Sequence, residues 1–354
     1  MNDRIILKDV VLLLRIGINN DERAMPQKVL VDITIETPLQ ACGETDNLAL
    51  TVDYRPLLEY VKCHIVPRKW NTIEALALNV CEATRYIAHE QHPARSYQVS
   101  VAVRKPEAHL PLPAAYPSVF IERSYESQID ARSVIAEHKR AEICERAATL
   151  FESDLGYAYI PDIISPEFSE KLQRDIARGG FEVSPLVYGK SLQRLSSFIL
   201  GTPDPFHPCV PELPHRFPVL QACNTVMADV YTDIVKVVRG DGRVPLNSIC
   251  VHRYPNSENG LTAHRDDSRF RNVVMILTLK GSAEFFVGKS VEDIGEHERR
   301  IVNPEVIRPV AGSLILQRAP RNNDEKGLRP FHAVGPITEE RISLIFQADN
   351  SVLL

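Results

Sequence analysis

Two stretches in the C-terminal half decide how this part of the chain folds: Gly260-Leu261-Thr262-Ala263-His264-Arg265-Asp266 and His332-Ala333-Val334-Gly335-Pro336-Ile337-Thr338. His264 and Asp266 stand two residues apart, so on an extended strand their side chains point to the same side. A second imidazole, His332, comes from a distant strand and completes a face of three ligands. Two histidines and one carboxylate leave coordination positions open, which is the arrangement that holds non-haem Fe(II) for oxygen chemistry.

The segments around these ligands are typical of short strands separated by turns. Residues 273–279 form an apolar run of strand length, and residues 307–316 read as a strand, a turn at Gly312 and a second strand. Arg341 lies in a further strand rich in Ile and Leu, where a buried charge needs a partner. An acidic co-substrate is the natural partner, because the planar guanidinium meets a carboxylate in two parallel hydrogen bonds.

These stretches, with Tyr254-Pro255 before them and Arg341-Ile342-Ser343-Leu344-Ile345-Phe346 after them, resemble the Fe(II)/2-oxoglutarate-dependent dioxygenases. The resemblance implies that Fe(II), 2-oxoglutarate and O2 are used together to oxidise, and by default hydroxylate, a C–H bond. It implies three iron ligands, namely His264, Asp266 and His332. The implied fold is a double-stranded β-helix, or jelly roll, with flanking helices.

The same resemblance assigns the 2-oxoglutarate site. Arg341 is expected to bind the distal carboxylate, and Ser343 shares its face of the strand and is expected to help. Tyr254 is either a hydroxyl donor to 2-oxoglutarate or a packed core aromatic. Asp267 would point to the opposite face from Asp266 and is not expected to be a ligand.

The N-terminal part alternates between strand-like and helix-like segments. Four segments are rich in β-branched and aliphatic residues and alternate as strands do: residues 4–12, 28–37, 97–104 and 118–122. Two segments carry apolar residues at helical spacing: residues 54–66 and 71–88. The predicted order β-β-α-α-β-β describes a small α+β domain.

This domain carries a second resemblance, to dihydroneopterin aldolase, over residues 1–124. The residues that carry it stand in four separate motifs: Ile16-Gly17-Ile18 with Asp21-Glu22, Val52-Asp53-Tyr54, Thr72-Ile73-Glu74 and Arg104-Lys105-Pro106. The family implies a tunnelling-type fold, an active site formed between subunits and therefore a homo-oligomer.

The resemblance also assigns the chemistry. Glu74, next to Ile73, would bind the pterin, because one carboxylate can accept two adjacent ring N–H groups. Lys105 would be the central proton carrier, with Tyr54 and Glu22 ordering water and the side-chain hydroxyls. The implied reaction is retro-aldol cleavage of dihydroneopterin to 6-hydroxymethyl-dihydropterin and glycolaldehyde. The alternative is a catalytically inactive domain that serves only as an oligomerisation scaffold.

Composition excludes several classes of function. With 44% hydrophobic and 25% charged residues the chain is ordinary for a globular protein. A net charge of −5 gives no reason to expect nucleic acid or an anionic membrane as a partner. Seven scattered cysteines, an odd number without a C-x-x-C pair, favour reduced thiols and a cytoplasmic location.

The expected organisation is an aldolase-like domain at residues 1–124, a helical connector at 125–150 and a dioxygenase domain at 151–354. The connecting helix could equally be the first helix of the second domain. A proline-rich loop at 199–216 is expected to be a substrate lid, and a metal site at His207 and Cys209 is the weaker interpretation.

Together these features predict a bifunctional enzyme that acts on small molecules, with a pterin bound in its N-terminal domain. One alternative keeps only the oxygenase active. Another makes the C-terminal barrel a binding or sensing module, which the presence of all three ligands and Arg341 disfavours.

Overall fold

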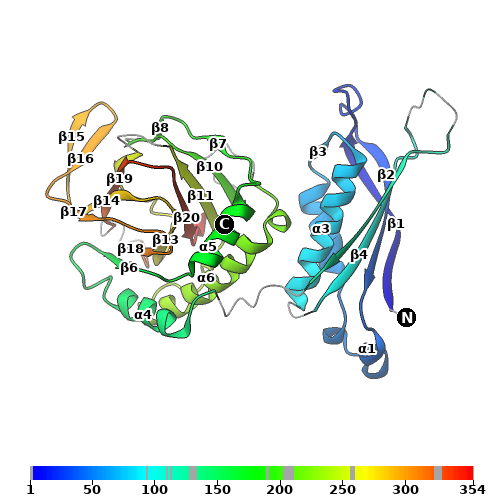
Figure 1. The fold of residues 1–354 in the computed structure, drawn as a ribbon, viewed down its shortest axis with the longest axis horizontal. Coiled ribbons are helices and arrows are strands. Elements are labelled where there is room, and N and C mark those ends of the chain that lie inside the picture. Colours follow the sequence, from blue (N-terminus) through cyan, green and yellow to red (C-terminus); the bar gives the residue numbers. More distant parts are fainter. Residues whose placement is uncertain are drawn as a thin grey trace. The chain divides into compact units, whose positions relative to one another are not determined.

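The computed structural model describes residues 3–92, 95–108, 111, 114–126, 134–188, 191–201, 211–255, 260–322 and 329–353. The chain divides into two compact units, Met1–Asp130 and Ala131–Leu354 (Figure 1). The division lies six residues after the domain end that the sequence predicted.

Unit 1 is one five-stranded sheet covered on one face by a long helix. Its strands are β1 (Arg4–Ile16), β2 (Gln27–Glu36), β3 (Lys69–Trp70), β4 (Tyr97–Arg104) and β5 (Ser118–Tyr125), in the order β3-β1-β2-β4-β5. Helix α3 (Ile73–Gln91) packs on β4 and β5 (Figure 1). The alternate residues of β2 and β4 that face α3 are buried, which gives unit 1 its core.

The remaining helices of unit 1 are short: α1 (Gln40–Thr45), η1 (Leu48–Leu50), α2 (Arg55–Tyr60) and η2 (Val61–Ile65). The sequence predicted one continuous helix over 54–66, whereas the structure ends the α-helix at Tyr60 and continues as a π-turn. The predicted order β-β-α-α-β-β is incomplete, because α1 and the two-residue strand β3 were missed. Both are shorter than any periodicity can reveal.

Unit 2 contains two large sheets. The first has seven strands in the order β6-β18-β13-β20-β11-β10-β7, and the second has four in the order β12-β19-β14-β17. The strands of the first are β6 (Tyr157–Ile160), β7 (Glu182–Val183), β10 (Ser196–Gly201), β11 (Ser248–Tyr254), β13 (Val273–Lys280), β18 (Leu314–Arg318) and β20 (Arg341–Gln347). Those of the second are β12 (Leu261–His264), β14 (Ala283–Gly288), β17 (Glu305–Ile307) and β19 (Phe331–Ile337).

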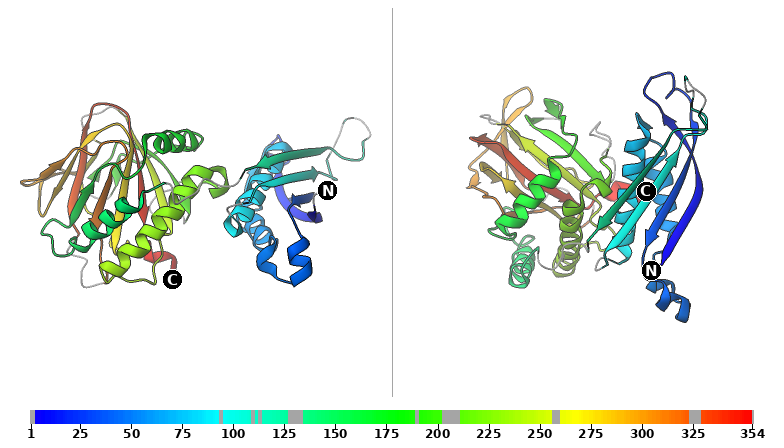
Figure 2. Two further views of the ribbon diagram at one scale, coloured as in Figure 1. Left: turned by 60° about the horizontal axis from the view of Figure 1, so that its bottom comes forward. Right: turned by 45° about the vertical axis from the view of Figure 1, so that its right-hand side comes forward.

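Two hairpins complete the strands: β8 (Val187–Tyr188) with β9 (Ser191–Leu192), and β15 (Val291–Gly295) with β16 (Glu298–Ile301). The helical elements of unit 2 are α4 (Glu137–Ala148), α5 (Pro166–Ile176), η4 (Pro214–Arg216), α6 (Pro218–Val237) and η6 (Asn350–Leu353). Figure 2 shows α5 and α6 along one side of the seven-stranded sheet.

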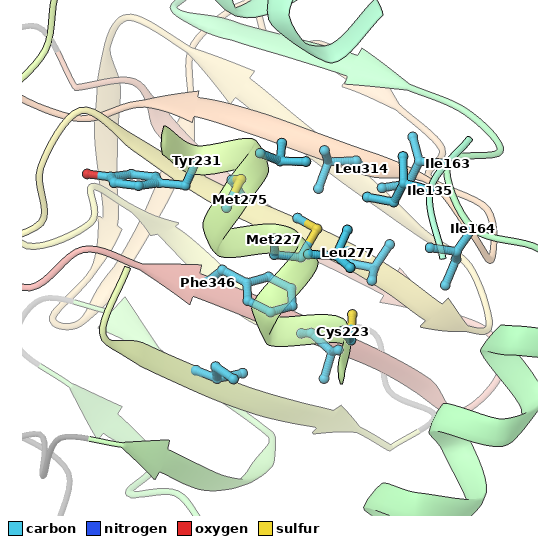
Figure 3. Packing of buried hydrophobic residues seen from close by; sticks show 14 of the residues in the cluster. Ile135, Ile163, Ile164, Cys223, Met227, Tyr231, Met275, Leu277, Leu314 and Phe346 are labelled. Carbon is cyan, nitrogen blue, oxygen red and sulfur yellow. The ribbon is translucent and has the colours of Figure 1, made fainter. Parts of the chain in front are cut away.

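The seven-stranded sheet has an apolar core on each face. Its outer face packs against the helices through residues such as Met227, Leu277 and Phe346 (Figure 3). Its inner face meets the four-stranded sheet through residues such as Ile276 and Phe285. Successive residues of a strand therefore alternate between a helix-facing core and a core between the sheets.

Helix α4 belongs to unit 2. Its Ile143 and Ala147 are fully buried in the helix-facing core, and Arg140 forms an ion pair with Asp233 of α6. Of the two interpretations of this helix, the structure therefore supports the first helix of the second unit rather than a connector. Among the described residues no helix is both long and apolar enough to cross a lipid bilayer.

Candidate functional site

His264, Asp266 and His332 lie together at one end of the four-stranded sheet. His264 and His332 are direct cross-strand partners on β12 and β19, and their ring centroids are 4.1 Å apart. Asp266 Oδ1 lies 3.9 Å from His332 Nε2. One ligand atom from each of the three residues lies within 4.8 Å of the others. This spacing is compatible with three donors around one ion.

Asp266 reaches this cluster from a turn and not from a strand. The sequence placed His264 and Asp266 on one extended strand, but β12 ends at His264. The Asp267 carboxylate accepts a hydrogen bond from the backbone N–H of Arg269 at 3.0 Å and so closes a local turn. The chain therefore leaves the sheet before Asp266, and strand alternation is not the reason that His264 and Asp266 lie together.

The hydrogen bond of His264 fixes which of its ring nitrogens is free. Its Nδ1 lies 3.0 Å from the backbone carbonyl of Thr262, so that nitrogen carries the proton and donates. Nε2 is then left with a lone pair, as a metal ligand requires. The ring of His332 stacks on Phe285 with centroids 5.6 Å apart, which fixes its orientation.

Burial changes the ionisation of the cluster. It raises the pKa of Asp266, and the positive charge of Arg329 is among the effects that partly offset this rise. Burial, together with the neighbouring His264, holds the pKa of His332 well below its usual range. His332 is therefore neutral near neutral pH, which is the form that binds metal. A cation bound among the three would favour the ionised carboxylate.

Two arginines hold the ligand-bearing segments together. The guanidinium of Arg265 lies 4.0 Å from the ring centroid of Phe331, the residue before His332. Arg329 donates to the backbone carbonyl of Asp266. The segments that carry the candidate ligands are thus tied together by Arg265, next to His264, and by Arg329, three residues before His332. Neither contact can be predicted from the sequence, because both depend on the pairing of β12 with β19.

Arg341 is buried without a negatively charged partner. Its side chain is on the inner face of β20 and the residue is 1% exposed. Nη1 donates to Ser343 Oγ at 3.3 Å and Nη2 donates to Thr278 Oγ1 at 3.2 Å. Among the described residues, no carboxylate lies within ion-pair distance of it. A buried guanidinium whose partners are neutral hydroxyls is poised for an anion from outside.

Tyr254 is the cross-strand partner of Arg341. Its ring centroid lies 5.4 Å from the Arg341 guanidinium carbon, and its hydroxyl is 3.2 Å from His252 Nδ1. Burial raises its pKa to about 12, so the hydroxyl keeps its proton. The tyrosine is thus both packed in the core between the sheets and able to donate beside Arg341.

The other cations near this site have partners of their own. Arg253 and Lys280 both pair with Glu340, and Arg269 Nε is 3.2 Å from the Asp349 carboxylate. Arg341 is therefore a better candidate than these cations to bind an acidic co-substrate. The predicted lid at 199–216 falls largely on residues 202–210, and these, with His207 and Cys209, lie outside the described residues.

In unit 1, the buried Lys105 forms an ion pair with Glu22, whose side chain is 41% exposed. Lys105 is 7% exposed, and its Nζ lies 3.2 Å from Glu22 Oε1 and 3.4 Å from the carbonyl of Ile16. The other carboxylate oxygen accepts from the backbone N–H groups of Ile18 and Asn19. Hydrogen bonding to Lys105 is the largest cause that lowers the pKa of Glu22.

Gly17 makes the bend that brings Glu22 to Lys105. Its φ is +156°, and a Cβ at this position would lie 2.4 Å from Glu22 Cβ. Any larger residue would push the Glu22 side chain away. The close approach of Glu22 therefore explains why the motif Ile16-Gly17-Ile18 has a glycine at its centre.

Tyr54 and Glu74 lie apart from this pair. Tyr54 is the N-cap residue of α2 and is 45% exposed, and Glu74 is exposed in the first turn of α3, next to Ile73. Among the described residues no contact links either side chain to Lys105 or Glu22. Contacts within one copy of unit 1 therefore join only two of the five predicted catalytic and pterin-binding residues, Lys105 and Glu22.

Comparison with known proteins identifies the family of unit 1. The family model of dihydroneopterin aldolase (FolB) matches residues 5–122. Dihydroneopterin aldolase of Bacillus subtilis is 30% identical over 106 residues, which are 30% of this chain and 82% of that protein. The folic acid synthesis protein FOL1 of Dictyostelium discoideum is 34% identical over 80 residues, 23% of this chain and only 12% of that protein. Through its N-terminal unit the chain belongs to the dihydroneopterin aldolase family.

Solved structures that resemble the larger part of the chain are 2OG-Fe(II) oxygenases. A Trichoplax adhaerens prolyl hydroxylase, solved with a peptide of hypoxia inducible factor, has a TM-score of 0.44 and 12% identity, covering 62% of this chain and 96% of its own. An oxidoreductase of the 2OG-Fe(II) oxygenase family from Burkholderia pseudomallei has a TM-score of 0.41 and 16% identity, covering 61% and 93%.

Proposed function

We propose that unit 2 is an Fe(II)/2-oxoglutarate-dependent oxygenase with a double-stranded β-helix fold, and that it hydroxylates a C–H bond of a small molecule. The observation that carries this proposal is the three-ligand cluster His264, Asp266 and His332 in the same unit as a buried, anion-free Arg341. The strand order supports the fold, because the strands from β11 to β20, apart from the hairpin β15–β16, divide between the two sheets, and both proposed ligand segments lie at β12 and β19 of the four-stranded sheet.

The donor set fits iron better than a structural metal. Two neutral imidazoles and one carboxylate suit Fe(II) with positions left open for co-substrates, whereas closed zinc sites need four protein ligands. Nε2 of His264 has a free lone pair, because Nδ1 donates to the Thr262 carbonyl. The lowered pKa of His332 keeps that imidazole neutral near neutral pH, so it too can bind a metal. Bound iron would supply oxygen activation coupled to decarboxylation of 2-oxoglutarate.

The protein's own residues position the co-substrate. Arg341 would bind the distal carboxylate in the planar geometry that guanidinium groups favour, and Ser343 and Thr278 already orient it. Tyr254 would add a hydroxyl donor at the same carboxylate. The contacts of Arg265 and Arg329 would keep the two ligand segments in register while substrates enter.

The direct test is succinate formation from 2-oxoglutarate by the purified full chain with Fe(II) and O2. We expect succinate from the natural chain and none from His264→Ala, with circular dichroism unchanged. Asp267→Ala is the matched control, because Asp267 is next to the ligand Asp266 but caps the local turn. Succinate from His264→Ala at the natural rate would remove the iron assignment.

We propose further that unit 1 binds a pterin and cleaves dihydroneopterin. The pairing of the buried Lys105 with Glu22 supports this. The Lys105 ammonium is held by a carboxylate and a backbone carbonyl, so its position is fixed and it can transfer a proton there. Glu74 and Ile73 at the start of α3 would bind the pterin ring. The separation of Tyr54 from Lys105 supports a site completed by a second subunit, and therefore a homo-oligomer.

The alternative is that unit 1 serves only as an oligomerisation scaffold. Glycolaldehyde release from 7,8-dihydroneopterin distinguishes the two. Release that depends on Lys105 supports the aldolase, and an oligomer that releases none supports the scaffold.

A further inference from the structure

Gln317 is a buried polar residue without a role in the proposed metal and 2-oxoglutarate sites. It is 1% exposed, and neither its Oε1 nor its Nε2 has a hydrogen-bond partner among the described residues. A buried amide without partners destabilises a fold, so native structures rarely keep one without a reason. Such a group is expected to have a partner that arrives from solution.

Gln317 faces the space between the two sheets. Along β18, Leu314 and Leu316 belong to the helix-facing core, and Ile315 and Ala319 belong to the core between the sheets. Alternation along the strand therefore directs Gln317 toward the four-stranded sheet.

Among the described residues, neither cross-strand neighbour of Gln317 hydrogen-bonds to its amide. The cross-strand partners of Gln317 are Val274 on β13 and Tyr157 on β6. Val274 has no polar side-chain atom, and neither atom of the Gln317 amide is hydrogen-bonded to Tyr157. The amide thus presents a free donor and a free acceptor side by side.

Gln317 lies toward the iron-ligand end of the sheet and away from Arg341. Its cross-strand partner Val274 is the second residue of β13, the strand that follows the segment 265–272 with Asp266. Thr278, which contacts Arg341, is four residues beyond Val274 on β13, or about 13 Å along the strand. The four C–C bonds between the carboxylates of 2-oxoglutarate span about 5 Å. A co-substrate anchored at Arg341 therefore ends short of Gln317, which leaves the amide to the substrate that is oxidised.

We infer that Gln317 selects the substrate of the proposed oxygenase, and that this substrate is a heterocycle with a lactam edge, an N–H beside a C=O, such as a pterin. The inference rests on the proposed function of unit 2. A primary amide pairs with a lactam through two parallel hydrogen bonds, each group donating one. The pterin ring carries this edge, and unit 1 belongs to a family named for a pterin substrate.

The reaction balances without a further reductant. One C–H bond of the pterin becomes C–OH with one oxygen atom of O2. The other oxygen atom enters succinate as 2-oxoglutarate loses CO2, and 2-oxoglutarate supplies the two electrons.

The test compares two probes, 6-hydroxymethyl-7,8-dihydropterin and its N3-methyl analogue, which lacks the lactam N–H. Succinate formation by the full chain with Fe(II), 2-oxoglutarate and O2 reports only the oxygenase. We expect the natural protein to need at least roughly tenfold more of the methylated probe for half-maximal stimulation, because a site built for a hydrogen bond rejects an analogue without it. In Gln317→Met this ratio should fall to about one, and the melting temperature should rise.

The matched control is Gln221→Met on α6, a buried glutamine in the helix-facing part of the unit, which should keep the natural ratio. Equal responses of the natural protein to the two probes, or an unchanged ratio in Gln317→Met, would overturn the inference. Succinate formation that neither probe stimulates would also overturn the inference, but it would leave the proposed oxygenase function intact. The absence of any succinate in the natural protein would instead remove the proposed function, and this inference with it.

Discussion

At the scale of single residues, Arg341 is the most sensitive test of the co-substrate site. Truncating one partner of a buried, charge-assisted pair costs about 2–5 kcal/mol. Arg341→Ala should therefore raise the KM for 2-oxoglutarate at least roughly thirtyfold, measured by succinate formation. Arg341→Lys should recover part of the loss, since lysine keeps the charge without the planar fork.

Arg253→Ala is the control for this prediction. Arg253 is the immediate neighbour of Tyr254, but it pairs with Glu340. Its removal should leave the KM for 2-oxoglutarate unchanged. If Arg253→Ala raises the KM and Arg341→Ala does not, the carboxylate-binding residue has been wrongly assigned.

A second residue-scale prediction concerns Lys105 and pH. Lys105 lowers the pKa of Glu22, so the pair contributes stability above the ordinary range for a glutamate. That contribution is lost as the pH falls through the lowered pKa. In Lys105→Met the pKa of Glu22 should rise toward its ordinary range, as followed by NMR titration, and glycolaldehyde release should stop. Succinate formation should be unaffected. A Glu22 pKa that does not move would show that the backbone N–H groups alone lower it.

The sequence could predict which candidate ligands lie together but not the environment of the site. His264, Asp266, His332 and Arg341 follow from residue type and spacing, because each chemistry needs few side chains. The unpaired state of Gln317 could not be predicted, because it depends on which residues β6 and β13 place beside it. In the same way, the sequence pattern placed Asp266 on a strand, because the alternation of residues does not show where the strand ends.

At the scale of elements, α4 tests where unit 2 begins. Ile143 is fully buried between α4 and the helices of unit 2. Ile143→Ala should lower the free energy of unfolding of unit 2 by about 2–5 kcal/mol, the usual cost of such a cavity. Glu145→Ala, on the exposed face of the same helix, should change it little.

The measurement is denaturant unfolding of the full chain, with Trp70, the single tryptophan, reporting on unit 1. The fluorescence transition should not move in Ile143→Ala, while the circular dichroism transition of unit 2 should. A shift of the Trp70 transition alone would contradict the assignment of α4 to unit 2.

Long elements were the easiest to predict. Apolar residues at helical spacing extend over several turns in 166–178 and 217–238, so the sequence predicts helices there, and α5 and α6 match them within two residues at each end. The hairpin β15–β16 has no such pattern and was not predicted. Its position over the sheet depends on tertiary contacts.

At the scale of the whole molecule, the sheet of unit 1 has surfaces that one copy does not cover. The edge strand β1 pairs with β3 only at Arg15 and Ile16, so most of its outer edge has no partner among the described residues. Large apolar residues are exposed on β1 and β5, with Leu13 at 62% and Phe120 at 66%. Exposed strand edges with apolar side chains favour association with another chain.

Phe120→Asp should therefore weaken the homo-oligomer, because a charge placed in an apolar interface must be desolvated. Size-exclusion chromatography with light scattering should show smaller particles. Leu78→Asp, which adds the same charge on the exposed face of α3, is the control and should leave the size unchanged.

Dissociation should separate the two activities. If Tyr54 of one copy completes the site at Lys105 of another, the dissociated Phe120→Asp protein should lose glycolaldehyde release in proportion to the loss of oligomer. Raising the protein concentration should restore the release, because assembly follows mass action. Succinate formation by unit 2 should continue, since His264, Asp266, His332 and Arg341 all come from one chain. A dissociated protein with full glycolaldehyde release would show that each copy of unit 1 holds a complete site. Tyr54 would then have to approach Lys105 within the same chain during the reaction.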